Sequence, residues 1–264
     1  MYYNDELQHT TDEPIDDNKS DCQREIFDSE GNVSSPNYPD SYPNDKRCAW
    51  LFVAAPGHRV KLEFKTFELE VGGNCSNDSV VVYDGDAADS RTLGRYCGSR
   101  LPRSPISSAN RLYVVFESNL SIRKKGFQAV HRTVCGGHLR ATDQVRYLYS
   151  HAAFGDAEYE NNTKCEWVVE ADYGYNVHLA FLTFELESNG NKECPDFVSV
   201  HSGFNNSGPL YGKYCGDTIP ANVVSSNNTV VVHFKTDHSV TKKGFSAYYV
   251  AIAAETTKIQ RSLV

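Results

Sequence analysis

Two stretches of the chain, FKTFELE and FLTFELE, each end a hydrophobic run on a glutamate, Glu70 in the first and Glu187 in the second. An aspartate follows each glutamate a few residues later, at Asp78 and Asp196. Carboxylates gathered on one rim repel one another unless a cation lies between them, so this arrangement favours a divalent metal site. The alternative is that these acids only keep loop ends solvated, which is the usual role of surface Asp and Glu. Recurrence of the pattern favours the metal.

The two acidic sites belong to an internal repeat that covers most of the chain. The matched segments are RVKLEFKTFELE (59–70) with NVHLAFLTFELE (176–187), LGRYCGSRLP (93–102) with YGKYCGDTIP (211–220), and SIRKKGFQAVH (121–131) with SVTKKGFSAYY (239–249). We therefore expect two domains, from residues 22–134 and 135–251, with hardly any linker between them. Residues 1–21 are acidic and poor in large aliphatics, which predicts disorder, and 252–264 are expected to form a loose tail.

The periodicity inside each repeat is that of β-strands. Val60, Leu62 and Phe64 alternate with polar residues, as in a half-buried antiparallel strand. Other β-branched and aromatic runs are separated by Gly, Pro, Asn and Asp, and no segment has the pattern of a long amphipathic helix. The expected fold is all-β, with two consecutive β-sandwiches. The apolar parity changes after Phe64 and again after Phe181, which predicts a bulge or bend that leaves the two glutamates beside the loops.

Eight cysteines in 264 residues indicate disulfides and an oxidising compartment. The repeat favours bonds within each unit, and pairing consecutive cysteines would give loops of similar size in both copies. The count alone allows roughly 105 connectivities. Zinc is the rival explanation, but no CxxC or HxxxH spacing occurs in the sequence. Disulfides are therefore the stronger prediction.

The charge excludes some partners and favours others. A net charge of −8 argues against nucleic acid, which needs a basic stripe, and fits cationic partners better. No run of about 18 apolar residues exists, so no membrane span is expected. The acidic start lacks the apolar core of a secretory signal. Together with the disulfides, this leads us to expect the C-terminal piece of a longer secreted, extracellular protein, or an incomplete gene model.

The ordered motifs resemble those of the CUB domain. SSPNYPDSYPNDKRCAW, the strand ending in FELE, NCSNDSVVVYDG, LGRYCG and KKGF follow one another in the first unit, and the second unit repeats the pattern. Longer stretches, APGHRVKLEF, RKKGFQAVHRTVCGGHLRA and LYSHAAFGD, are similar to the last two CUB domains of tolloid-type astacin metalloproteases, the procollagen C-proteinase group. The resemblance implies a jelly-roll β-sandwich per unit and two disulfides in each: Cys22–Cys48, Cys75–Cys97, Cys135–Cys165 and Cys194–Cys215.

The resemblance also implies a calcium site at one end of each sandwich. In the second unit the family's ligand positions fall on Glu187, Asp196, Asp237 and Ser239, with Tyr159 in support. In the first unit they fall on Glu70, Asp78, Asn119 and Ser121, with Tyr42 in support. Calcium suits such a set because it takes hard oxygens at about 2.3–2.6 Å. The outer carboxylate oxygens would then be organised to accept a partner's Lys or Arg.

Both units depart from the family pattern. Asn119 replaces an aspartate, which removes a negative charge and predicts weaker calcium binding in the first unit. Asn119 also begins a glycosylation sequon, and a glycan there would exclude metal ligation. In the second unit, CPD is one residue shorter than CSND, which makes Asp196 the less certain match. The better-placed glycosylation candidates are Asn32, Asn161, Asn205 and Asn227.

The sequence points to a binding module rather than an enzyme. No HExxH motif occurs, so the zinc site of an astacin protease belongs only to the suspected parent, which would also carry EGF-like units. We expect a calcium-dependent protein-binding module, the non-catalytic end of a tolloid-like protease acting in matrix assembly or patterning. Its partners would present Lys or Arg, as in procollagens or patterning antagonists. The rivals are a stand-alone secreted CUB protein that mediates adhesion or binds glycans, and a spacer that only sets domain geometry.

Overall fold

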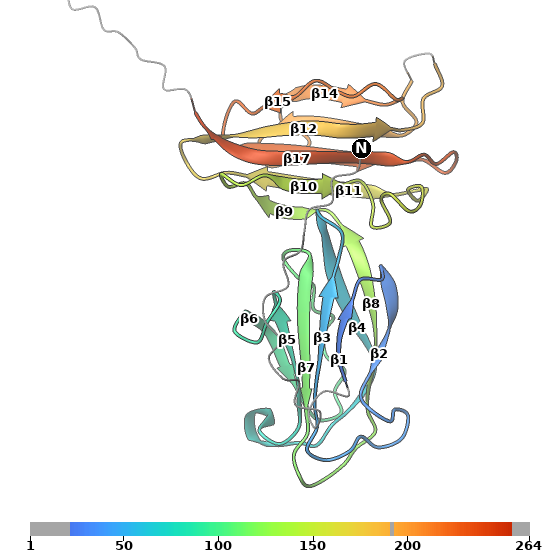
Figure 1. Ribbon diagram of the computed structural model, residues 1–264, viewed down its shortest axis with the longest axis vertical. Helices are drawn as coiled ribbons and strands as arrows, with labels where there is room; N and C mark the ends of the chain where they lie inside the picture. Colours follow the sequence, from blue (N-terminus) through green and yellow to red (C-terminus); the bar gives the residue numbers. More distant parts are fainter. Residues whose placement is uncertain (1–21, 191–192, 255–264) are drawn as a thin grey trace, which may run out of the picture.

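The computed structural model describes residues 22–190 and 193–254, and the tail predicted for residues 1–21 lies outside the described part. The first unit is a β-sandwich of two sheets, and the second unit repeats it (Figure 1). Among the described residues, no helix has the length and apolar character that crossing a bilayer requires. The predicted all-β fold is confirmed.

The first unit packs a five-stranded sheet against a three-stranded sheet. In spatial order the larger sheet is β1 (Gln23–Ile26), β3 (Arg47–Val53), β7 (Arg111–Glu117), β5 (Ser79–Asp84) and β6 (Arg91–Tyr96). The smaller sheet is β2 (Glu30–Ser34), β8 (Gly126–Cys135) and β4 (His58–Glu68). A single 3-10 turn, η1 (Gly73–Cys75), follows β4. Buried apolar residues between the sheets, including Trp50, Leu62 and Phe127, form one core.

The second unit has the same layers, with one short strand added to its smaller sheet. Its larger sheet is β14 (Leu210–Tyr214), β13 (Phe197–Ser202), β16 (Thr229–Lys235), β11 (Lys164–Glu170) and β9 (Gly137–Arg140). Its smaller sheet is β10 (Arg146–Tyr149), β17 (Gly244–Ala253), β12 (Tyr175–Glu185) and the short β15 (Val223–Val224). β17 includes the first two residues of the tail predicted for 252–264, and residues beyond 254 lie outside the described part.

The predicted irregularity in the repeated phrase is a bulge in both units. The pairing of β4 with β8 shifts register between Phe64 and Thr66. The pairing of β12 with β17 shifts between Phe181 and Thr183. Side chains alternate with a period of two, so the extra residue returns the apolar residues beyond it to the core face. The bulge thereby fixes where each strand ends and where the following glutamate lies.

All four disulfides have the predicted partners. Two lie in each unit, and the described residues contain no free cysteine: Cys22–Cys48, Cys75–Cys97, Cys135–Cys165 and Cys194–Cys215. Each bridge closes a loop of between 21 and 30 residues. Bridges of this span contribute about 3 kcal/mol each on the chain-entropy model.

The two units meet where the turn before β4, which contains Gly57, contacts the second unit. β8 ends at Cys135 and β9 begins at Gly137, so the chain passes between sandwiches without a linker. The buried indole of Trp167 donates a 2.5 Å hydrogen bond to the Gly57 carbonyl. The strands of the two units run in crossed directions (Figure 1).

Candidate metal centre

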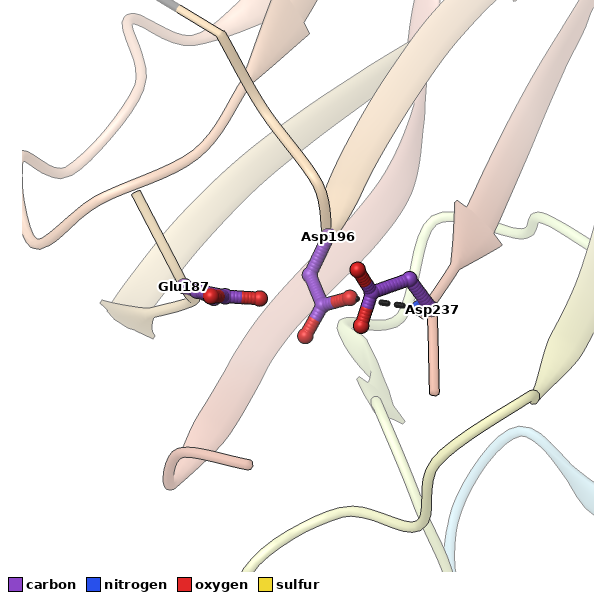
Figure 2. Close-up of side chains that lie close together, drawn as sticks. All are labelled: Glu187, Asp196 and Asp237. Carbon is purple, nitrogen blue, oxygen red and sulfur yellow. Dashed lines mark hydrogen bonds between the residues drawn. The ribbon is translucent and has the colours of Figure 1, made fainter. Parts of the chain in front are cut away.

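Three carboxylates of the second unit converge at one end of its sandwich. Glu187 lies two residues beyond β12, Asp196 directly precedes β13, and Asp237 lies two residues beyond β16. β13 and β16 are neighbours in one sheet, and β12 ends beside them in the other, so three separate chain segments reach the same rim. One oxygen of each carboxylate lies within 4.8 Å of the others. Figure 2 shows Asp196 between the other two, with all three groups turned toward one another.

Asp196 is held in place by donors on both of its oxygens. The Tyr159 hydroxyl donates to Oδ2 at 2.6 Å, and the backbone N–H of Asp237 donates to Oδ1 at 2.7 Å. The same tyrosine hydroxyl accepts a 3.1 Å bond from the backbone N–H of Glu187. Burial, followed by the bond to Asp196, raises the pKa of Tyr159 well above its ordinary value, so the hydroxyl keeps its proton. Tyr159 therefore braces two of the three carboxylate positions.

Glu187 differs from Asp196 because one of its oxygens has no partner. Its Oε2 is buried and receives no hydrogen bond in the structure. Burial, then the charges of Asp237 and Asp196, raises the pKa of Glu187 above its ordinary value. A buried carboxylate oxygen facing two other acids is unfavourable by itself. The rim thus has an excess of acceptors, which a bound cation would relieve.

Ser239 completes the group of residues predicted for this rim. Its backbone N–H and its hydroxyl both donate to Asp237 Oδ1, at 2.7 and 3.1 Å. These bonds fold the loop after β16 so that Asp237 faces the other acids. The donor set of three carboxylates and a nearby hydroxyl consists of hard oxygens from separate loops, which is the chemistry that calcium prefers. Soft-metal ligands are absent from this cluster, because it contains no cysteine or histidine.

The first unit brings its predicted residues together but joins them differently. Tyr42 donates to Asp78 Oδ2 at 2.5 Å, and the backbone N–H of Asn119 donates to Asp78 Oδ1 at 2.8 Å. The backbone N–H of Glu70 donates to the Tyr42 hydroxyl at 3.1 Å. These three bonds repeat the framework of the second unit. Burial, then the bond to Asp78, raises the pKa of Tyr42 in the same way.

The carboxylate of Glu70, unlike that of Glu187, is surrounded by donors. The side-chain amide of Asn77 donates to Oε1 at 2.9 Å, and that of Asn119 donates to Oε2 at 3.0 Å. The Ser121 hydroxyl lies 3.1 Å from the same Oε2. Amide N–H groups here fill the role that a cation would fill, because they supply positive partial charge to the carboxylate. The residues of this rim fit a metal less well than those of the second rim.

Asn77 is the one rim residue that the sequence reasoning missed. Its side-chain amide donates a hydrogen bond to Glu70 Oε1 at 2.9 Å. The sequence signal for it is the extra residue in CSND relative to CPD, which gives the first unit an amide without a counterpart. The predicted fates of Asn119 were metal ligation or glycosylation. In the structure its amide donates to Glu70 Oε2 at 3.0 Å, and both fates stay predictions.

The four favoured glycosylation sites all have exposed asparagines, as a glycan requires: Asn32, Asn161, Asn205 and Asn227. Asn205 and Asn227 use their side-chain oxygens to accept local backbone N–H groups, at 3.0 Å in both cases. Glycan attachment at any of them stays a prediction.

Comparison with known proteins agrees with the twofold architecture. The family model described as "CUB domain" matches residues 22–131 and 135–249. Tolloid-like protein 2 of Homo sapiens is 40% identical over 243 residues, which cover 92% of this chain and 23% of that protein. The dorsal-ventral patterning protein tolloid of Drosophila melanogaster is 36% identical over 232 residues, 88% of this chain and 22% of that protein. The chain therefore spans about a quarter of the length of these relatives.

Two solved structures are also similar. The CUB1-EGF-CUB2 domain of human MASP-1/3 has a TM-score of 0.38 and 23% identity, covering 85% of this chain and 100% of that one. The MASP-1 CUB2 domain bound to Ca2+ has a TM-score of 0.38 and 24% identity, covering 43% of this chain and 98% of that one.

Proposed function

This chain belongs to the CUB domain family, and from that premise we propose that it is an extracellular protein-binding module whose second domain docks partners in a calcium-dependent way. The observation that carries the proposal is the buried, unpartnered Oε2 of Glu187 beside Asp196 and Asp237. Disulfide-rich CUB domains are typical of extracellular proteins, where calcium is abundant enough to fill sites of modest affinity.

Glu187, Asp196 and Asp237 would hold the ion, with Ser239 beside them. Bound calcium supplies positive charge that offsets the mutual repulsion of the carboxylates. Tyr159 keeps Asp196 fixed, and Ser239 keeps Asp237 turned inward, so little reorganisation is needed on binding. The carboxylate oxygens that face outward can then accept hydrogen bonds from a cationic side chain.

The charge of the second domain supports a partner that presents Lys or Arg. Residues 135–254 contain 13 Asp and Glu against 8 Lys and Arg. Such an excess attracts basic surfaces and speeds encounter, with an effect that weakens as salt is added. Mutating one charged group of a desolvated ion pair typically costs 2–5 kcal/mol of binding free energy. A single partner lysine in this rim would therefore matter.

The tolloid relationship gives the module its proposed setting. The chain is homologous to tolloid-like proteins over their CUB region, and the catalytic domain of those relatives is not among the matched residues. We infer that the chain recruits or restricts substrates such as procollagens or patterning antagonists for a protease of that group. The likeness to the dorsal-ventral patterning protein tolloid of Drosophila melanogaster supports the second class of substrate.

The experiment uses immobilised full chain and purified procollagen in surface plasmon resonance. Binding should appear with calcium, disappear with EDTA, and weaken when the procollagen lysines are acetylated. The Asp237→Asn variant should lose the calcium-dependent response. The Asp143→Asn variant removes an exposed acid in the same domain outside the rim, so it should bind normally. Equal binding in calcium and EDTA would contradict the proposal and favour a spacer role.

A further inference from the structure

We propose that the matching rim of the first CUB domain is a second docking surface, which needs no metal and takes an extracellular protein segment that combines apolar and acidic side chains. This inference goes beyond the calcium-dependent function of the second domain. It concerns the loop after β4, which carries Val71, and the loop between β7 and β8, which carries residues 118–125. We call this surface the apolar rim.

The first observation is that the apolar rim is organised without a cation. Both oxygens of Glu70 accept side-chain amide donors, from Asn77 and Asn119, and both oxygens of Asp78 are bonded as well. Ser121 adds its hydroxyl to Glu70 and its backbone N–H to the Asn119 side-chain oxygen at 2.7 Å. Each acid at this end therefore has its hydrogen-bond partners inside the protein. Removing calcium should leave the surface unchanged.

The second observation is that large apolar side chains adjoin members of this cluster in the chain and face solvent. Val71 is 73% exposed, Leu120 is 77% exposed and Ile122 is 54% exposed. Single exposed apolar residues are common on protein surfaces, but three on two adjacent loops at one end of a sandwich are less so. The corresponding positions in the second domain are Ser188, His238 and Val240. The positions of Val71 and Leu120 are therefore apolar in the first domain and polar in the second.

The third observation is that Leu120 is presented on a fixed backbone. The Asn44 side-chain amide donates to the Leu120 carbonyl at 2.9 Å, and the backbone N–H of Asp45 donates to the Asn119 carbonyl at 2.8 Å. These two bonds restrain the backbone at Leu120 before a partner arrives. Binding then costs less entropy, which is the advantage of a preorganised surface.

Charge defines the partner that this surface fits. Arg123, Lys124 and Lys125 follow Ile122 in the same loop, and Thr241 stands in place of Arg123 in the second domain. Within the described part of the chain, no carboxylate forms an ion pair with any of these three cations. Residues 22–134 contain 15 Lys and Arg against 13 Asp and Glu, the reverse of the balance in the second domain. The complementary segment therefore carries acidic residues beside its apolar ones.

The size of the cationic group favours a protein segment over a membrane. Recruitment to anionic lipid typically uses clusters of about 4–8 Lys and Arg. The loop provides three, and one of them, Lys125, places its ammonium 5.7 Å from the Tyr38 ring centroid. Tyr38 and Lys125 thereby extend the surface toward the loop that precedes β3 and add an aromatic face for contact.

The test is selection of random displayed peptides on the full chain in EDTA. Enriched peptides should pair a large apolar residue with Asp or Glu. The informative variant is Val71→Ser with Leu120→His, because both new residues occur at these positions of the second domain. It should bind the selected peptides at least about tenfold more weakly, because two apolar side chains that the peptide would bury are replaced by polar ones. Adding Arg123→Thr should weaken peptide binding further and make it less sensitive to salt.

The matched controls are Val240→Ser and Asp237→Asn in the second domain, which should leave peptide affinity unchanged. Enriched peptides without acidic residues, or binding that needs calcium, would overturn the proposal. Leu120-dependent binding to phosphatidylserine vesicles without peptide enrichment would overturn it in favour of a membrane. Tighter peptide binding after removal of residues 1–21 would instead identify that acidic segment of the chain as the occupant. Circular dichroism checks that each variant is folded.

Discussion

The indole Nε1 of Trp167 in the second domain donates a 2.5 Å hydrogen bond to the carbonyl of Gly57 in the first. Two more bonds cross the same junction, from the backbone N–H of Tyr149 to the Pro56 carbonyl at 3.1 Å and from Arg59 Nε to the Gly136 carbonyl at 2.8 Å. Trp167 is fully buried, so leaving its N–H without a partner would be costly. These three hydrogen bonds therefore hold the two domains in a defined relative orientation.

Gly57→Ala should destabilise this junction. Gly57 has a φ of +82°, and a Cβ there would overlap Cδ1 of Leu148. Strain at positive φ together with overpacking costs about 1–3 kcal/mol. Urea unfolding followed by tryptophan fluorescence measures the loss. Gly174→Ala is the matched control, because Gly174 also has a positive φ of +86° but no atom lies within 4 Å of its Cβ position. An equal loss in both variants would show that strain alone is responsible.

Acid should loosen the junction through His58. Burial, the largest cause, lowers the pKa of His58 to about 4 from its ordinary 6.5. The folded state therefore binds the proton less tightly than the unfolded state, so this stability is complete above pH 6.5 and is lost as the pH falls toward 4. Between pH 7 and 5, the free energy of unfolding should fall by about 2 kcal/mol from His58 alone.

The control for the acid effect is His58→Asn. Burial also lowers the pKa of His131 and of His233, so these two histidines contribute to the same pH range. The variant should keep their share of the pH dependence and lose the share of His58. Urea unfolding at pH 7 and pH 5 gives the comparison. An unchanged difference between the two pH values would contradict this role for His58.

Glu187→Gln should have opposite effects on the calcium-free and the calcium-bound protein. Removing the charge relieves the repulsion with Asp196 and Asp237, so the calcium-free form should gain stability of about 1 kcal/mol or less. The gain corresponds to a rise in Tm of a few degrees. Addition of calcium should then produce no further rise. Scanning calorimetry with and without calcium measures both, and a calcium-induced rise equal to that of the original protein would contradict the ligand role.

Tyr159→Phe should weaken both stability and calcium affinity. The hydroxyl bonds Asp196 and the Glu187 backbone, and losing it leaves buried groups unpaired at a cost of about 1–3 kcal/mol. Tyr42→Phe is the counterpart in the first domain, where the same two kinds of bond are made. It should cost similar stability without changing calcium affinity. Loss of calcium binding in the Tyr42 variant would place the ion in the first domain and contradict the assignment to the second.

Asn119→Asp should give the first domain some affinity for calcium. The change replaces an amide that donates to Glu70 with a third carboxylate, as in the second domain. Because Asn77 still donates to Glu70, we expect the new site to be weaker than the one proposed for the second domain. The calcium-free variant should also be less stable. Calorimetric titration should show a second, weaker event, and its absence would show that Asn77 alone prevents metal binding.

Much of the fold could be predicted because the chain repeats itself. The parity change after Phe64 and Phe181 located both bulges, and the repeat favoured the disulfide partners that the structure has. The residues of both rims lie together as the resemblance implied. Local patterns were sufficient here because the features recur at the same place in each copy.

The parts that could not be predicted depend on where side chains point. Asn77 looks like any loop asparagine in the sequence, and only the folded loop directs its amide to Glu70. The contact of Gly57 with Trp167 joins residues 110 positions apart. No periodicity or motif records such a pair, because packing between domains is set by the shape of both surfaces.

The central claim is that the second domain, and not the first, holds calcium between Glu187, Asp196 and Asp237. The most direct measurement is isothermal calorimetric titration of the full chain with calcium, repeated with Asp237→Asn. The account predicts one binding event for the original protein and none for the variant, with Asp143→Asn behaving like the original. A calcium event of undiminished affinity in the Asp237→Asn protein would contradict it.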